Sequence, residues 1–74
     1  MPLDNCQKQI RLHTKLRETY DDVKKIYDIK EIEFDQYHLE LISINETPAT
    51  GDHHIMLTCE QLKKYKFEVE NPNA

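Results

Sequence analysis

Hydrophobic residues recur along the first third of the chain at the spacing of an amphipathic helix. Asp4 can cap such a helix, and Gln7 three residues later completes a capping-box pair. No glycine or proline interrupts the chain from there to Pro48. On a helical wheel, five apolar side chains fall within about 80° of arc: Leu12, Leu16, Tyr20, Val23 and Tyr27. The pattern predicts one long amphipathic helix over residues 4–28.

A second apolar stripe, made of Leu3, Cys6 and Ile10, lies about 100° or more away from the first on the same wheel. Either the helix begins after Asp4, or it buries two faces. A second buried face in so short a chain predicts contact with another subunit or a partner protein, through Leu3, Cys6 and Ile10. Heptad spacing extends over fewer than three repeats, which is too short to predict a coiled coil.

After Asp28 the hydrophobic period changes to the alternation that is typical of strands. Strands are predicted at about residues 30–34, 37–44, 54–58 and 66–70. The alternation changes phase after Asp35 and after Leu41, which fits either a tight turn or a bulge, so that residues 30–44 form a hairpin or one bent strand. Thr58 and Gln61 predict a capping box for a short helix over about residues 59–65.

These elements together predict an α+β fold in a single small domain, residues 1–74. The long N-terminal helix would pack on a small antiparallel sheet of three to four strands, with the short second helix before the last strand. A chain of 74 residues has room for one domain.

Composition predicts a soluble cytoplasmic protein. No stretch approaches the roughly 18 consecutive apolar residues of a membrane helix, and residues 1–4 lack the basic and apolar regions of a signal peptide. We therefore expect Cys6 and Cys59 to be reduced, packed thiols. The excess of lysine and isoleucine over arginine, alanine and glycine is typical of a low-GC bacterium or its phage.

Residues for catalysis or cofactor binding are sparse. His53, His54 and Cys59, with His38 nearby on a predicted strand, lack the paired-ligand spacing of a structural zinc site, so no metal is predicted, although the pattern leaves open whether they bind one. The chain has one glycine and therefore no glycine-rich phosphate loop. We expect a non-enzymatic protein without a cofactor.

Basic residues suggest one possible function. Lys8, Arg11 and Lys15 fall within about 60° of arc on the predicted helix and would form a nucleic-acid contact. Glu18 and Asp22 continue the same face with the opposite charge. The net charge of −4 also disfavours nucleic acid, because binding is driven mainly by phosphate neutralisation.

Acidic residues suggest a second function, the binding of a protein. The second part of the chain is rich in carboxylates, and an acidic surface is predicted at Glu31, Glu33, Asp35 and Glu40. Such a surface would dock on a basic protein. The favoured hypothesis is a small protein-binding regulator, inhibitor or adaptor that self-associates as a homo-oligomer. The alternative is a nucleic-acid-binding module.

Overall fold

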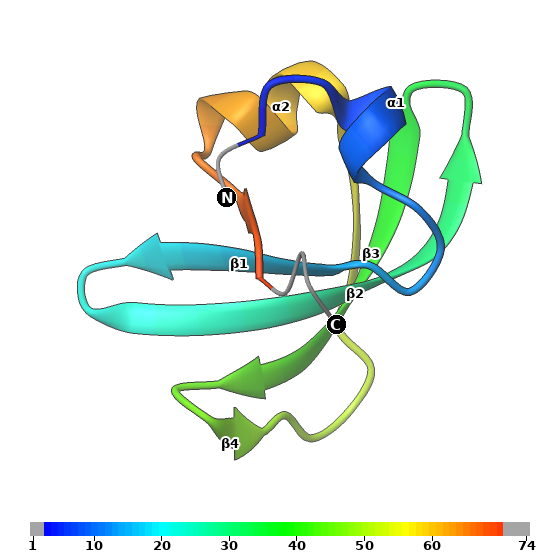
Figure 1. The fold of residues 1–74 in the computed structure, drawn as a ribbon. Coiled ribbons are helices and arrows are strands. Elements are labelled where there is room, and N and C mark those ends of the chain that lie inside the picture. The colour runs from blue at the N-terminus through cyan, green and yellow to red at the C-terminus, as the bar shows by residue number, and fades with distance from the viewer. Residues whose placement is uncertain (1–2, 71–74) are drawn as a thin grey trace.

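A computed structural model describes residues 3–70, and these form mainly antiparallel sheet (Figure 1). The ends of the predicted domain, residues 1–2 and 71–74, lie outside the described residues. The described elements are two short helices and six strands: α1 (Cys6–Gln9), β1 (Lys15–Tyr20), β2 (Val23–Glu33), β3 (Gln36–Ile44), β4 (Thr47–Pro48), β5 (His54–Thr58), α2 (Cys59–Lys64) and β6 (Glu68–Val69).

The predicted long helix over residues 4–28 is wrong, and so is the α+β arrangement built on it. The segment instead contains α1, β1 and the first half of β2. Asp21 and Asp22 have φ angles of 50° and 64° and form a two-residue turn, across which Tyr20 pairs with Val23. Aspartate adopts this left-handed backbone more readily than most residues, so the hairpin needs no glycine.

The sheet is an open antiparallel meander, and the last strand, β6, returns to one of its edges. Strands β1, β2 and β3 are antiparallel neighbours, and β4 and β5 share the far edge of β3. β6 pairs with the outer edge of β1 through Leu16 and Arg17. Residues 30–44 form a hairpin that turns at Phe34 and Asp35, and the β2–β3 pairing is also bulged, with register shifts at Ile26/Tyr27 and at Ile29/Glu31. Residues 30–44 therefore form the hairpin, and the alternative of one bent strand is wrong.

The core lies on one face of this sheet, beneath the two helices. Its fully buried side chains come from three strands, α2 and the segment before β6: Leu16, Ile29, Leu39, Leu62 and Phe67. The rings of Tyr27 and Phe67 lie 5.6 Å apart between centroids. α2 begins where the sequence predicts, and the capping box of Thr58 and Gln61 is present.

The N-terminal segment is fixed to the core by a disulfide. Cys6 in α1 is bonded to Cys59 in α2, with a Cα–Cα distance of 6.0 Å, and the two residues are 53 positions apart in sequence. The expectation of reduced thiols is therefore wrong for this structure. α1 is capped by the side chain of Asn5, which accepts from the Lys8 amide, and not by Asp4. Within residues 3–70, no helix is long and apolar enough to span a membrane.

Candidate functional site

Carboxylates and histidines gather on the side of β2, β3 and β5 that faces away from the core. Side chains alternate between the two faces of a strand, so His38 and Glu40 of β3 share one face. His38 pairs with Glu31 of β2 and Met56 of β5, and Glu40 pairs with Asp28 and His54. We call this surface the acidic face, which comprises Glu31, Glu33, His38, Glu40, Asp52, His54 and Met56.

Two His–carboxylate clusters lie on the acidic face. In the first, His38 Nε2 lies 3.0 Å from Glu33 Oε1, and Glu31 is adjacent. In the second, His54 Nε2 lies 3.5 Å from Glu40 Oε2, and the third member is Asp52. Each cluster brings three potential ligand atoms within 4.8 Å of one another, and one imidazole with two carboxylates can bind a divalent transition metal. Exposed acidic groups of this kind are also common without an ion.

The metal ligands considered from the sequence are not brought together. Cys59 is disulfide-bonded and has no thiolate to offer. The His53 side chain contacts its own loop, where its Nε2 lies 3.1 Å from the Thr50 carbonyl oxygen. His38 and His54 belong to different clusters.

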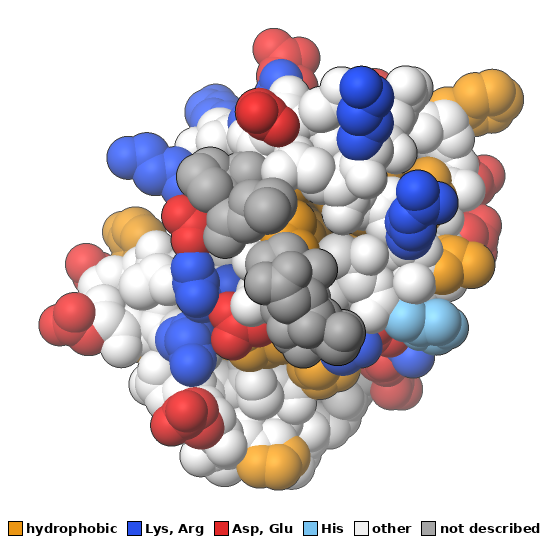
Figure 2. Space-filling model, viewed as in Figure 1, with side chains coloured by type: hydrophobic (Ala, Val, Ile, Leu, Met, Phe, Trp, Pro, Cys, Tyr) orange, Lys and Arg blue, Asp and Glu red, His pale blue; other side chains and the backbone are white. Residues whose placement is uncertain are grey.

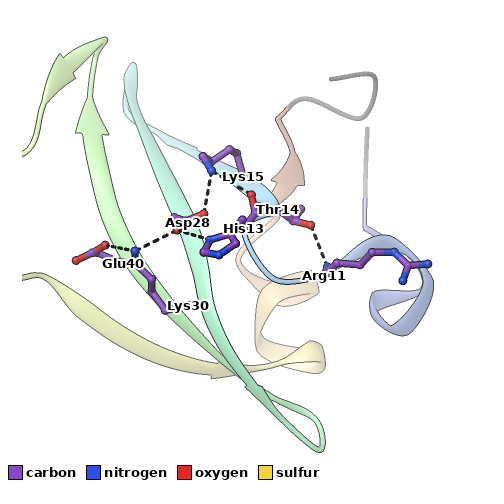
Figure 3. A network of polar contacts seen from close by, with 7 residues as sticks. All are labelled: Arg11, His13, Thr14, Lys15, Asp28, Lys30 and Glu40. Carbon is purple, nitrogen blue, oxygen red and sulfur yellow. Dashed lines mark hydrogen bonds and ion pairs between the residues drawn. The ribbon is translucent and has the colours of Figure 1, made fainter.

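Beside the acidic face, Asp28 anchors a network of ion pairs between β1, β2 and β3 (Figure 3). The Asp28 side chain is 8% exposed. Its Oδ1 lies 2.9 Å from Lys15 Nζ, and its Oδ2 lies 3.3 Å from His13 Nδ1 and 3.4 Å from Lys30 Nζ. Lys30 also lies 3.1 Å from Glu40 Oε1, so one ammonium group bridges the buried Asp28 and the acidic face.

Local charges set the protonation of this network. Burial alone would raise the pKa of Asp28, but hydrogen bonds from Lys15 and His13 and the charge of Lys15 outweigh it and lower that pKa. The hydrogen bond to Glu40, and then that to Asp28, raises the pKa of Lys30. The network therefore keeps Asp28 ionised and holds Glu40 in a fixed position on the sheet.

Phe34 is an exposed aromatic residue at the tip of the β2–β3 hairpin. Its side chain is 98% exposed, and its φ angle of 54° lies in the left-handed region. A bulky residue rarely adopts this conformation, which costs of order 1–2 kcal/mol. The next residue, Asp35, accepts a hydrogen bond from the Cys59 amide, which ties the tip to the start of α2.

The structure separates the candidate groups proposed from the sequence. Of the predicted acidic surface, Glu31, Glu33 and Glu40 lie on the acidic face, and Asp35 lies in the turn beside Phe34. The stripe predicted to self-associate is buried in the core, where Leu3, Cys6 and Ile10 are 9%, 2% and 3% exposed. These three residues pack the domain itself and offer little surface to a partner.

The proposed nucleic-acid residues share no helix face, because the helix does not exist. Lys8 lies in α1 and Arg11 in the segment after it. Lys15 begins β1 and is paired with Asp28. Glu18 and Asp22 were expected to continue that helix face. In the structure Glu18 lies in β1 and Asp22 in the turn that follows it. On the side seen in Figure 2, lysine and arginine side chains are interspersed with acidic ones and do not gather into one patch.

Sequence reasoning missed Asp28, Lys30 and Phe34. A signal was present for Asp28, because a charged residue in the run Ile26-Tyr27-Asp28-Ile29 is either exposed or paired when buried. No such signal marked Lys30, whose position depends on a bulge. Comparison with protein-family models, with curated proteins and with solved structures found no match to this chain.

Proposed function

We propose that this protein is a small non-enzymatic binding protein that docks a basic protein segment on its acidic face. The observation that carries the proposal is the placement of the exposed Glu31 and Glu33 and the half-buried Glu40 on one side of the sheet. These residues come from two strands, and the Lys30–Glu40 contact orients one of them.

The chemistry of the acidic face favours a cationic partner. Exposed carboxylates accept charge-assisted hydrogen bonds from lysine and arginine, and they repel the phosphates of a nucleic acid. Met56, which is 50% exposed, lies among them and offers an apolar contact. Phe34, at the end of the same hairpin, has the aromatic character of residues that often dominate binding energy. An open sheet surface of this kind suits a macromolecule better than a small substrate, which needs a concave pocket.

Binding to a lysine- and arginine-rich synthetic peptide, measured by fluorescence anisotropy at low and at physiological salt, tests the proposal. The triple variant E31Q/E33Q/E40Q should lose roughly tenfold in affinity, because three charge pairs at or near the surface contribute about 0.2–1 kcal/mol each. The matched control D22N/E46Q/E60Q removes the same charge from α2 and two hairpin turns. It should bind like the wild type.

Two results would contradict the proposal. Equal weakening by both triple variants would show attraction to net charge alone. Tighter binding to a single-stranded oligonucleotide than to the peptide would favour a nucleic-acid partner.

A further inference from the structure

We infer that the outer edge of β5 pairs with the same edge of a second copy of this chain, which joins two sheets across a two-fold axis at Ile55. The β5–β5 pairing is independent of the proposed function. It rests on the backbone polarity, the side chains and the charges of a single strand.

β5 is an edge strand without the usual protection against pairing. One of its edges bonds to β3, and within residues 3–70 no strand pairs with the other. Edge strands commonly carry lysine, proline or other charged residues that oppose association. The five residues of β5, His-Ile-Met-Leu-Thr, include no lysine, arginine, proline or carboxylate. Ile55 and Met56 are 38% and 50% exposed.

The ladder with β3 determines which backbone groups are free. The Leu41 amide donates to the His53 carbonyl, and the Cys59 amide donates to the Asp35 carbonyl. Hydrogen-bonded pairs alternate along an antiparallel ladder, so the odd-numbered residues of β5 bond to β3 and the even-numbered ones point outward. The outward groups therefore belong to His54, Met56 and Thr58.

Thr58 is already satisfied by the helix that follows. Its amide donates to Gln61 Oε1 at 2.9 Å, and its carbonyl stands at the N-cap position, where it accepts the first bond of α2. The edge therefore presents four groups for pairing: the N–H and C=O of His54 and of Met56. Burying a strand edge whose N–H and C=O groups are unpaired costs free energy of folding. An edge whose groups face solvent is a template on which another strand can pair.

One register uses all four groups. With the two-fold axis at Ile55, His54 lies opposite Met56 of the second copy, and each such pair exchanges two hydrogen bonds. The Ile55 side chains of the two copies then meet at a close, non-hydrogen-bonded position. The alternative axis at Met56 would place His54 opposite Thr58, whose amide is taken, and Asp52 opposite Glu60, which have like charges.

The pairing would also join the two acidic faces. His54 and Met56 lie on the outer side of the sheet, so a continuous sheet carries the His–carboxylate clusters of both copies on one surface. A second subunit is also a common source of stability for chains this short, whose cores rarely supply more than about 3–5 kcal/mol.

Light scattering coupled to size exclusion, over a range of protein concentrations, tests the assembly. The wild type should reach twice the chain mass of 8.9 kDa. Ile55→Lys should remain at the single-chain mass with an unchanged circular dichroism spectrum, because it places two ammonium groups against each other at the axis. Ile44→Lys is the matched control, since Ile44 is also 38% exposed on a strand but lies in β3, paired on both sides. It should dimerise like the wild type.

Cysteine cross-linking tests the register in a variant that disturbs the fold less. Under mild oxidation Ile55→Cys should form an intermolecular disulfide, identified by mass spectrometry with the Cys6–Cys59 bond intact, and Met56→Cys should not. A wild type that stays monomeric at the highest concentration, or a cross-link through Met56→Cys only, overturns the inference.

Discussion

Removing the Cys6–Cys59 disulfide should cost the domain about 4 kcal/mol of unfolding free energy. The bond joins residues 53 positions apart, and the chain-entropy relation for a loop of that length gives about 4 kcal/mol at 25 °C. The stability expected for a domain of 74 residues is roughly 4–11 kcal/mol. The double variant C6A/C59A should therefore keep roughly 0–7 kcal/mol, a loss of about a third or more of the total.

Chemical denaturation, followed by far-ultraviolet circular dichroism and by tyrosine fluorescence, measures this loss. The chain has four tyrosines and no tryptophan, so the fluorescence signal reports Tyr27 and Tyr37 in the core together with two others. The dependence of unfolding free energy on denaturant should also steepen, because an unfolded chain without the cross-link is more expanded.

Reduced wild-type protein separates the cross-link from the packing of the sulfur atoms. It keeps both side chains, so its stability should fall nearly as far as that of C6A/C59A. A loss below about 1 kcal/mol in both samples would refute the entropic reasoning. Free thiols in the native, air-oxidised protein would show that the bond does not form.

Three further predictions concern single residues. The pKa of Asp28 is lowered in the folded state, so the stability that the ionised carboxylate provides is present above its unfolded pKa of about 3.9 and is lost as pH falls through the folded pKa. Asp28→Asn should cost about 1–3 kcal/mol at neutral pH and should flatten the decline of melting temperature at acidic pH. An unchanged decline would refute the pairing of Asp28. Burial, and after it the charge and hydrogen bond of Glu18, raises the pKa of Tyr27 to about 12. The stability of the wild type should therefore decline from about pH 10 upward, and that of Tyr27→Phe should decline less. The absorbance of tyrosinate measures this ionisation directly. Phe34→Gly should raise stability by roughly 0.5–1 kcal/mol, because glycine relieves the left-handed backbone, and should weaken peptide binding; lower stability would show that the exposed ring packs in solution.

The long helix was predicted because its apolar spacing fits two structures. Steps of four residues, from Leu12 to Leu16 to Tyr20 and from Val23 to Tyr27, keep side chains on one face of a helix, and an even step also keeps them on one face of a strand. Only the step of three from Tyr20 to Val23 distinguishes the two, and it crosses the Asp21–Asp22 turn. The only local sign of this turn is the Asp21-Asp22 pair itself, without the glycine or proline that more often marks a turn.

Prediction succeeded where local signals agree. The strand at residues 54–58 has the predicted bounds, because alternation and the Thr58 cap both define its end. The strand predicted at 37–44 is β3, which begins one residue earlier. By contrast, the strand predicted at 30–34 is the end of the longer β2, and that at 66–70 contains the two-residue β6.

The acidic face could be predicted only as a set of charges. Alternation in residues 31–40 suggested exposed carboxylates, but the His38 and His54 contacts depend on the register between β3 and its neighbours. The Cys6–Cys59 bond depends on tertiary structure in the same way. Nothing local to Cys6 shows that α1 will lie against the start of α2.

The Asp21–Asp22 turn gives this molecule a convenient point of attachment. Both residues are exposed, and the turn lies at the end of the β1–β2 hairpin, away from the helices (Figure 1). Loop closure becomes costlier only slowly with length, by about 0.6 kcal/mol for each doubling. A fluorophore, an affinity tag or a grafted recognition loop can therefore be attached at this turn, at little cost in folding free energy. The turn lies away from β5, so the chain can serve as a compact display scaffold.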